Sequence, residues 1–256
     1  AIGLKSEEFA DIGIKVDGQY KQLNANTLQI ENEFYSTVRP KQIAASCEKP
    51  TLALKHRGVK YIEIRSLDLD IFNPIGIDES KSRFVEAFLL NCLLQDSPDY
   101  TGNEQQLNNT NQLSVAHLGR KPDLELNKDG QHIPLKTWAN EILDSMQVVC
   151  EILDEDLVDK PYSLALQQQA KVVADPELTP SAKILQGMRT NQQPFGRFGL
   201  ETSALHKQHF KQHKLDKVST QQLEQMAVNS HHKQQEIEAN DSLPFDDFLK
   251  QYFSQK

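Results

Sequence analysis

The chain has little cysteine and no long hydrophobic run. Its three cysteines, Cys47, Cys92 and Cys150, are widely spaced and form neither a CxxC pair nor a disulfide-rich pattern. The longest apolar stretches, such as FVEAFLLNCLL, are interrupted by polar residues and are shorter than the roughly 20 residues that a membrane span needs. These absences favour a reducing cytoplasm and argue against a membrane protein. We expect Cys92 and Cys150 to be buried structural thiols within helices, and Cys47 to lie in a loop.

The chain also has fewer basic than acidic residues. The 256 residues include 36 acidic and 28 basic residues, which gives a net charge of -8. Such a balance opposes non-specific binding to nucleic acid and to anionic membranes. Glycine-rich phosphate loops of the Walker or dinucleotide type are missing as well, so a nucleotide would have to be held by a metal and side chains.

The first third of the sequence reads as strands. The stretch IGIKVDGQYKQL, residues 12–23, predicts a hairpin because Asp-Gly suits the positive φ values of tight turns. Residues 27–35, TLQIENEFY, alternate as a strand that places Glu31, Glu33 and Tyr35 on one face. Residues 59–67, VKYIEIRSL, alternate in the same way. In this second strand Glu63 and Arg65 share the polar face, and Ile62 and Ile64 face a core.

The remaining sequence is mostly helical. Asp78 is a predicted cap of a helix that continues to about residue 95, and a stripe through Trp138 predicts a core helix over 135–153. Thr179 and Pro180 are predicted to begin another helix. The tail from Ser219 predicts a long solvated helix. After it, the aromatic residues of PFDDFLKQYF are expected to pack against the rest of the fold. Residues 97–112 are polar and predict an exposed loop.

This order predicts an α+β fold in which the sheet comes first and the helices follow. We expect a β-rich part over 1–78 and a helical region over 79–256 packed on it, as one structural unit.

Five residues of the two predicted strands could carry chemistry if their polar faces line one concavity. Carboxylates are hard oxygen ligands for Mg²⁺, and an arginine can grip phosphate oxygens or a substrate carboxylate through two parallel hydrogen bonds. The alternative is a solvated sheet face with cross-strand ion pairs, which is the more common outcome of such a pattern. The residues concerned are Glu31, Glu33, Tyr35, Glu63 and Arg65.

A second cluster is the histidine run LHKQHFKQH. His206, His209 and His213 fall near one helical face, so a transition-metal site has to be considered. The neighbouring Lys and Gln residues favour the alternative, which is a hydrated surface helix without a metal.

Several stretches carry a resemblance to a known family. LQIENEFYSTVRPK followed by GVKYIEIRSLDLDIFNPIGIDE resembles the proteobacterial type of glutamate-cysteine ligase, or γ-glutamylcysteine synthetase. The likeness continues through LGRKPDLEL, DPELTPSAKIL and QEIEANDSLPF, so it covers essentially the whole chain. It is a likeness to the C-terminal half only. The N-terminal half of that family contributes further metal-binding acidic residues and part of the ATP and glutamate pockets.

The resemblance implies an ATP-dependent carboxylate-amine ligase related in architecture to glutamine synthetase, with a curved antiparallel sheet that forms a funnel. In such a ligase ATP phosphorylates the γ-carboxylate of L-glutamate, and the amine of L-cysteine displaces the phosphate. Mg²⁺ ions, with Mn²⁺ as an alternative, bridge the phosphates. The product, γ-glutamylcysteine, is the first intermediate of glutathione synthesis.

The resemblance also implies roles for single residues. Glu63 matches a metal-ligand glutamate, Arg65 an arginine that faces the nucleotide phosphates, and Tyr35 a tyrosine of the cysteine pocket. Glu33 and Arg39 match motif positions as well; Glu33 is expected to tune the acidic face and Arg39 to attract a carboxylate. The histidine run and residues 97–112 have no counterpart in the family pattern.

We therefore expect a cytoplasmic chain that carries half of a split active site, takes ATP, glutamate and cysteine as substrates, and is inactive without its N-terminal half. Two alternatives are open. One is a related ligase with another amine acceptor, and the other is a non-catalytic interaction domain whose acidic face only pairs charges.

Overall fold

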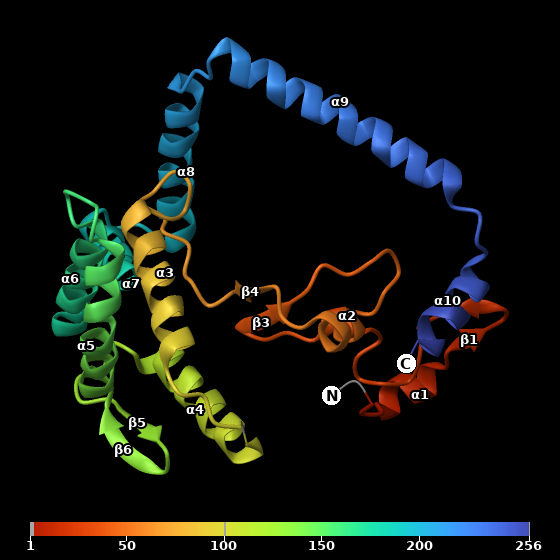
Figure 1. The fold of residues 1–256 in the computed structure, drawn as a ribbon, viewed down its shortest axis with the longest axis horizontal. Helices are drawn as coiled ribbons and strands as arrows, with labels where there is room; N and C mark the ends of the chain where they lie inside the picture. The colour runs from red at the N-terminus through yellow and green to blue at the C-terminus, as the bar shows by residue number, and fades with distance from the viewer. Residues whose placement is uncertain (1–2, 100, 256) are drawn as a thin grey trace. The chain divides into compact units, whose positions relative to one another are not determined.

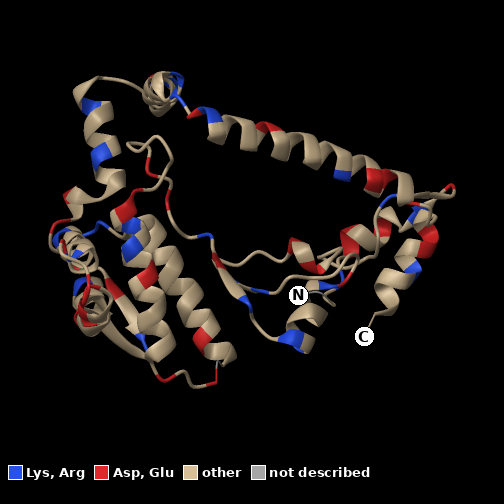
Figure 2. Ribbon diagram, turned by 45° about the horizontal axis from the view of Figure 1, so that its top comes forward, with Lys and Arg blue, Asp and Glu red and all other residues tan. Residues whose placement is uncertain are grey.

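The computed structural model of the chain describes residues 3–99 and 101–255 (Figure 1). The chain divides into two compact units, which are described separately. Unit 1 comprises Ala1–Asp68 and Leu215–Lys256, and unit 2 comprises Leu69–Lys214. In Figure 2 acidic and basic residues are interspersed along the helices of both units. The described residues contain no helix that is long and apolar enough to cross a membrane.

Unit 1 begins with helix α1 (Glu7–Ile12) and the predicted hairpin. Strands β1 (Lys15–Val16) and β2 (Gln19–Tyr20) pair antiparallel. Between them Asp17 and Gly18 have φ angles of 51° and 76°, as a tight hairpin turn requires. The hairpin prediction is confirmed, although its strands are only two residues long.

A second antiparallel pair in unit 1 joins β3 (Val38–Lys41) to β4 (Tyr61–Ile64), with helix α2 (Pro50–Arg57) between them in sequence. The strand predicted over 59–67 is confirmed in its centre. The strand predicted over 27–35 is wrong, because this segment contains a short 3-10 helix, η1 (Glu31–Glu33). The Gln29 side chain accepts from the N–H of Leu23 and of Asn24, and such local bonds compete with strand pairing.

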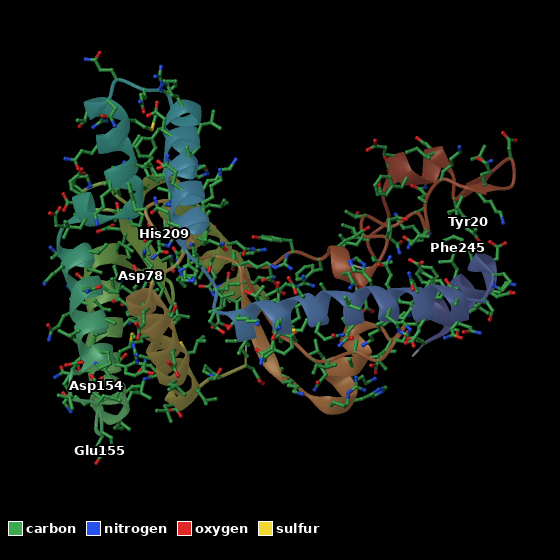
Figure 3. All side chains as sticks on the ribbon, turned by 90° about the horizontal axis from the view of Figure 1, so that it is seen from above. Tyr20, Asp78, Asp154, Glu155, His209 and Phe245 are labelled. Carbon is green, nitrogen blue, oxygen red and sulfur yellow. The ribbon has the colours of Figure 1, made fainter. Side chains whose placement is uncertain are left out.

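Two late helices complete unit 1. Helix α9 (Lys217–Asn240) has no buried residue, which confirms the predicted solvated helix. Helix α10 (Phe245–Ser254) buries Leu249 and places the Phe245 ring 5.5 Å from the Tyr20 ring in an edge-to-face contact (Figure 3). The aromatic segment near the end of the sequence therefore packs on the first hairpin.

The core of unit 2 lies between helices α3 (Glu79–Leu94), α5 (Leu135–Leu153) and α6 (Pro161–Ala174). The Asp78 side chain accepts a hydrogen bond of 2.6 Å from the Lys81 N–H, so the predicted cap of α3 is confirmed. The stripe of α5 turns Met146, Val149 and Cys150 into the core, while Trp138 is half-buried. Cys150 is buried as expected. Cys92 is exposed, so its predicted burial is wrong.

Residues 97–112 differ from their prediction. Helix α4 (Gly102–Leu118) occupies most of this range. Thr101 and Glu104 form a reciprocal capping box at its start, a signal that the polar composition conceals. Asn111 then joins α4 to strand β5 (Glu125–Lys128), because its side chain bonds both the N–H and the C=O of Asn127, at 2.9 and 2.6 Å. The loop prediction is therefore wrong.

Unit 2 also contains strand β6 (Gln131–Pro134), which pairs antiparallel with β5, a 3-10 turn η2 (Pro176–Leu178) and helices α7 (Pro180–Thr190) and α8 (Phe195–Gln212). The Thr179 side chain caps α7, as predicted. Helices with small antiparallel sheets confirm the α+β fold class. The division into a β-rich part over 1–78 and a helical region over 79–256 stays a prediction.

Candidate active site

The register of β3 and β4 decides which side chains share a face. Arg39 lies opposite Glu63, and Lys41 lies opposite Tyr61. Residues that are directly opposite on antiparallel strands point to the same side of the sheet. Arg39, Lys41, Tyr61 and Glu63 therefore form one face, which we call the polar face. The backbone N–H of Arg65 bonds to the Thr37 carbonyl at 2.7 Å, so the pairing continues one step beyond the strands.

Glu63 is the centre of the polar face. Its Oε1 accepts a hydrogen bond of 2.8 Å from Arg65 Nε and also lies 2.8 Å from Arg65 Nη2, while its Oε2 lies 3.2 Å from Nζ of Lys41. The hydrogen bond from Arg65 and then the nearby ammonium group of Lys41 hold the pKa of the Glu63 carboxyl below its ordinary value. The group is therefore ionised at neutral pH. Its Oε2 is buried, and the contact with Lys41 lacks hydrogen-bond geometry, so this oxygen retains accepting capacity.

Tyr35 joins this cluster from outside the strands. The guanidinium carbon of Arg65 lies 5.8 Å from the centroid of the Tyr35 ring, which is a cation–π distance. The Tyr35 side chain is 63% exposed. The structure thus brings together Tyr35, Glu63 and Arg65, with Arg39 opposite Glu63 in the register.

The other two acidic residues have different partners. Glu33 Oε2 accepts from the N–H of Gln29 at 2.6 Å, so this carboxylate folds back onto its own segment. Glu31 Oε2 accepts from Thr51 N and Oγ1 at 3.0 and 2.6 Å, at the start of α2. Glu31 and Glu33 therefore do not extend the polar face around Glu63, because residues 27–35 do not form the predicted strand.

Lys41 was missed as a site residue. Its position two residues after Arg39 signals a shared strand face, but only if 38–41 is recognised as a strand. Pro40 within this stretch argues against a central strand and hides that signal.

The described residues hold no group of three or more His, Cys, Asp or Glu side chains that could bind a metal by themselves. Of the histidine run, His206 is half-buried and its Nε2 lies 2.8 Å from the Ile71 carbonyl, while His209 and His213 are exposed. The run therefore lies on a surface helix end, and Glu63 is the carboxylate that a metal would find on the polar face.

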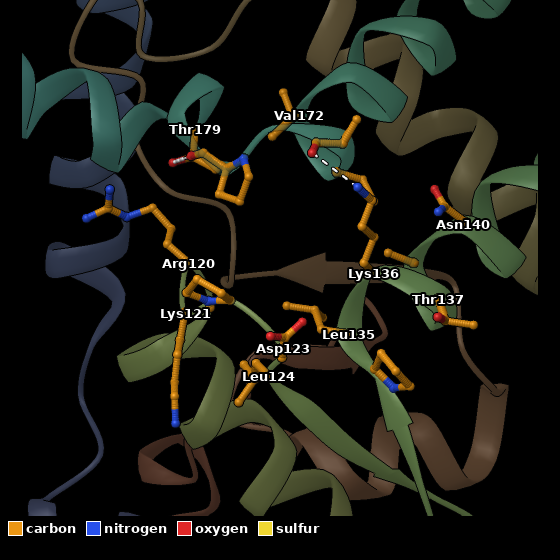
Figure 4. A pocket seen from close by; sticks show the side chains of 17 residues that line it. Arg120, Lys121, Asp123, Leu124, Leu135, Lys136, Thr137, Asn140, Val172 and Thr179 are labelled. Carbon is orange, nitrogen blue, oxygen red and sulfur yellow. Dashed lines mark hydrogen bonds between the residues drawn. The ribbon is translucent and has the colours of Figure 1, made fainter.

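A pocket of about 730 Å³ lies in unit 2, away from these residues in sequence (Figure 4). The stretches LGRKPDLEL and DPELTPSAKIL contribute to its wall, together with the start of α5 and the end of α6. Two of its cations already have partners, since Arg120 lies 3.5 Å from Glu177 and Lys136 Nζ donates to the Ala174 carbonyl at 3.2 Å. The pocket contains none of the predicted site residues.

Comparisons with known proteins give the context of this geometry. A family model described as glutamate-cysteine ligase matches residues 1–115. The glutamate-cysteine ligase of Shewanella halifaxensis is 42% identical over 253 residues, which are 99% of this chain and 48% of that protein. The enzyme of the same name from Azotobacter vinelandii is 42% identical over 252 residues, with the same 48% of its length covered.

A solved structure agrees with these sequence matches. The crystal structure of glutamate-cysteine ligase from Francisella tularensis in complex with AMP matches with a TM-score of 0.88 and 36% identity, over 99% of this chain and 50% of that one. The chain thus spans about half the length of the curated relatives it matches. The resemblance predicted from its motifs is confirmed: the chain is a relative of the C-terminal half of glutamate-cysteine ligase.

Proposed function

We propose that this chain supplies one half of the active site of an ATP-dependent glutamate-cysteine ligase that works in the cytoplasm. The observation that carries the proposal is the polar face of β3 and β4, where the ionised Glu63 lies beside Arg65 and Lys41 and close to Tyr35. The relatives named glutamate-cysteine ligase and the AMP complex of the Francisella enzyme support it.

The proposed reaction has two transfers. A γ-carboxylate oxygen of L-glutamate attacks the γ-phosphorus of ATP, so that an O–P bond forms and ADP leaves. The amine of L-cysteine then attacks the carbonyl carbon of the γ-glutamyl phosphate, a C–N bond forms, the C–O bond to phosphate breaks and the amine loses a proton. The products are γ-glutamylcysteine, ADP and phosphate. Activation is needed because a carboxylate is a poor electrophile until one oxygen becomes a leaving group.

Glu63 fits the role of a metal ligand. It is ionised because of its basic neighbours, and its Oε2 is an oxygen with remaining accepting capacity. Mg²⁺, or Mn²⁺ in its place, prefers oxygen ligands and would neutralise charge on the nucleotide phosphates. One carboxylate is a small share of six ligands, so the others must come from phosphates, water and residues outside this chain.

Arg65 fits the role of a phosphate clamp. A guanidinium has five N–H donors, and Glu63 engages the Nε and Nη2 positions, so donors remain for phosphate oxygens. Lys41 adds a second positive charge on the same face.

Tyr35 is proposed to contact cysteine, because an exposed phenol offers an apolar ring and a hydrogen bond to a small amino acid. Arg39 is proposed to attract a substrate carboxylate from its place opposite Glu63, and Glu33 to tune the local charge.

The test is ATP-dependent phosphate release and γ-glutamylcysteine formation, measured for this chain and for the full-length protein that contains it. Activity in the full-length protein only supports a split active site. Turnover by the chain alone would contradict the expected inactivity, and activity in neither would favour a non-catalytic domain in which Glu63 only pairs with Arg65 and Lys41.

The amine acceptor needs its own test. Replacing Tyr35 by alanine in the full-length protein should raise the KM for cysteine and leave the KM for ATP unchanged. Competition between cysteine and other amines, followed by the identity of the dipeptide product, then separates a cysteine ligase from a relative with another acceptor.

A further inference from the structure

Helix α10 is held firmly within unit 1. Lys15 Nζ lies 3.0 Å from Asp246 Oδ2, and Leu249 is only 7% exposed. With the contact between Phe245 and Tyr20, these interactions fix both the start and the middle of the helix. Gln255, the residue that follows α10, is therefore attached to a helix whose position in unit 1 is fixed.

Gln255 makes three hydrogen bonds to one short turn. Its side-chain Oε1 accepts from the N–H of Lys49 at 3.0 Å, and its Nε2 donates to the Cys47 carbonyl at 2.8 Å. Its backbone carbonyl accepts from Lys49 Nζ at 3.1 Å. The two ends of the Gln255 amide thus clamp residues 47–49.

One residue of this turn has an unfavourable backbone conformation. Cys47 has a φ angle of 61°, a left-handed conformation that costs free energy for a residue other than glycine. Lys49 is the N-cap of α2 but supplies no side-chain cap. The Gln255 amide bonds the N–H of this N-cap residue, so it ties the start of α2 to the end of α10.

The start of α2 is in turn bonded to the segment that carries Tyr35. Glu31 accepts from both Thr51 N and Thr51 Oγ1, and a carboxylate is favoured there by the positive end of the helix dipole. Glu31 begins η1, and Tyr35 follows four residues later. A continuous chain of hydrogen bonds and helix backbone therefore joins Gln255 to the base of the Tyr35 segment.

We propose that Gln255 is a positioning residue for Tyr35, which acts through the 47–49 turn, the start of α2 and Glu31. The inference rests on the proposed function, in which Tyr35 contacts cysteine. Loss of the clamp should weaken the use of cysteine and leave the nucleotide side of the reaction unchanged.

The decisive variant is Gln255→Ala in the full-length protein. We expect the KM for cysteine to rise about fivefold, the effect of one or two lost hydrogen bonds, with kcat and the KM for ATP within about twofold. Gln255→Glu keeps the acceptor for the Lys49 N–H and should recover most of the loss. Gln251→Ala, on the exposed side of the same helix, is the matched control and should change nothing.

Two further measurements test the route. Glu31→Ala should also raise the KM for cysteine. The double variant of Glu31→Ala and Gln255→Ala should raise this KM by less than the product of the two single effects. In a Cys92→Ser background, alkylation of Cys47 should be faster in Gln255→Ala than in Gln251→Ala, and this readout does not depend on activity.

The outcomes are distinct. An unchanged KM for cysteine, or an equal change in every kinetic constant, overturns the inference while the proposed function stands. Unchanged Cys47 alkylation overturns the clamp itself. A parent protein that makes no γ-glutamylcysteine overturns the proposed function, and the positioning role with it.

Discussion

The two units differ in where their apolar side chains lie. Unit 2 buries a contiguous core that includes Leu143, Met146 and Cys150. In unit 1 the reverse face of β3 and β4 leaves Val38 47% and Ile62 42% exposed, more than the 32% of the Glu63 side chain. The proposed chemistry therefore lies in the loosely packed unit. The best-packed part of this chain and the proposed site are therefore different parts of it.

The largest effect should come from Glu63→Gln in the full-length protein. Removing the charge of the proposed metal-ligand carboxylate should lower kcat about 100-fold to 1000-fold, because stabilisation of charge in the transition state is lost. The thermal midpoint should hardly move, since ion pairs that are partly open to solvent contribute only about 0–1 kcal/mol. Formation of γ-glutamylcysteine and a thermal melt measure the two quantities.

The control for this variant is Glu8→Gln, on the exposed surface of α1 in the same unit. It should retain full activity. If Glu63→Gln turned over as fast as Glu8→Gln, unit 1 would carry no catalytic carboxylate on its polar face. That result would favour the alternative of a non-catalytic interaction domain.

Asp154→Ala should produce the largest loss of stability in unit 2. The fully buried Asp154 carboxylate accepts from the N–H groups of Tyr162 and Ser163 at 3.0 and 2.8 Å. Leaving these donors unpaired should lower the free energy of unfolding of the 256-residue chain by about 3 kcal/mol. Urea denaturation measures it, with Asp156→Ala in the same turn as the exposed control.

The same residue gives a pH dependence. Burial would raise the Asp154 pKa, but hydrogen bonds from Ser163 and Tyr162 outweigh it and hold the pKa below its ordinary value. A lowered pKa stabilises the folded state above the unfolded pKa of about 3.9, and the contribution is lost as the pH falls through the folded value. The stability difference between the parent chain and Asp154→Asn should thus shrink below about pH 4. A constant difference would contradict this.

Asn111→Ala should have a smaller effect on unit 2. Its amide satisfies both backbone groups of Asn127 and ties α4 to β5, so its removal should cost about 1–2 kcal/mol of unfolding free energy. Asn109→Ala, exposed on the same helix, serves as the comparison in urea denaturation. Equal stability of the two variants would mean that water replaces the Asn111 bonds at no cost.

The smallest change is expected at the Arg57–Glu48 ion pair of unit 1. Hydrogen bonds from Arg57 and then from the Ala45 N–H lower the pKa of Glu48 to about 2. Arg57→Ala should raise this pKa toward its ordinary value of 4.5 without reaching it, because the Ala45 N–H remains. NMR titration of the Glu48 carboxyl carbon measures it. Lys55→Ala should leave the value unchanged, and an unchanged value in Arg57→Ala would refute the assigned cause.

Regular periodicity and caps allowed much of unit 2 to be predicted. The three-to-four residue stripe of α5 and the caps at Asp78 and Thr179 are local signals that tertiary structure preserved. Helix α4 was missed because its exposed, amide-rich surface resembles a loop in composition. Only the capping box of Thr101 and Glu104 marked its start.

The site was predictable only in part. The two-residue spacing of Glu63 and Arg65 places both on one side of a strand, and the structure pairs them directly. The involvement of Lys41 depends on the pairing of β3 with β4, which is non-local and not encoded in the spacing. The 27–35 segment alternates like a strand, but side-chain bonds to its own backbone and to the backbone of Asn24 fold it differently.

The sheet of β3 and β4 has only two strands, so each strand keeps one unpaired edge, and its reverse face carries the exposed Val38 and Ile62. Natural sheets guard such edges, because open edges invite strand addition and aggregation. The ribbon that holds the polar face is therefore also the part of unit 1 that is most open to strand addition, because a strand pairing with either edge would satisfy its free backbone groups.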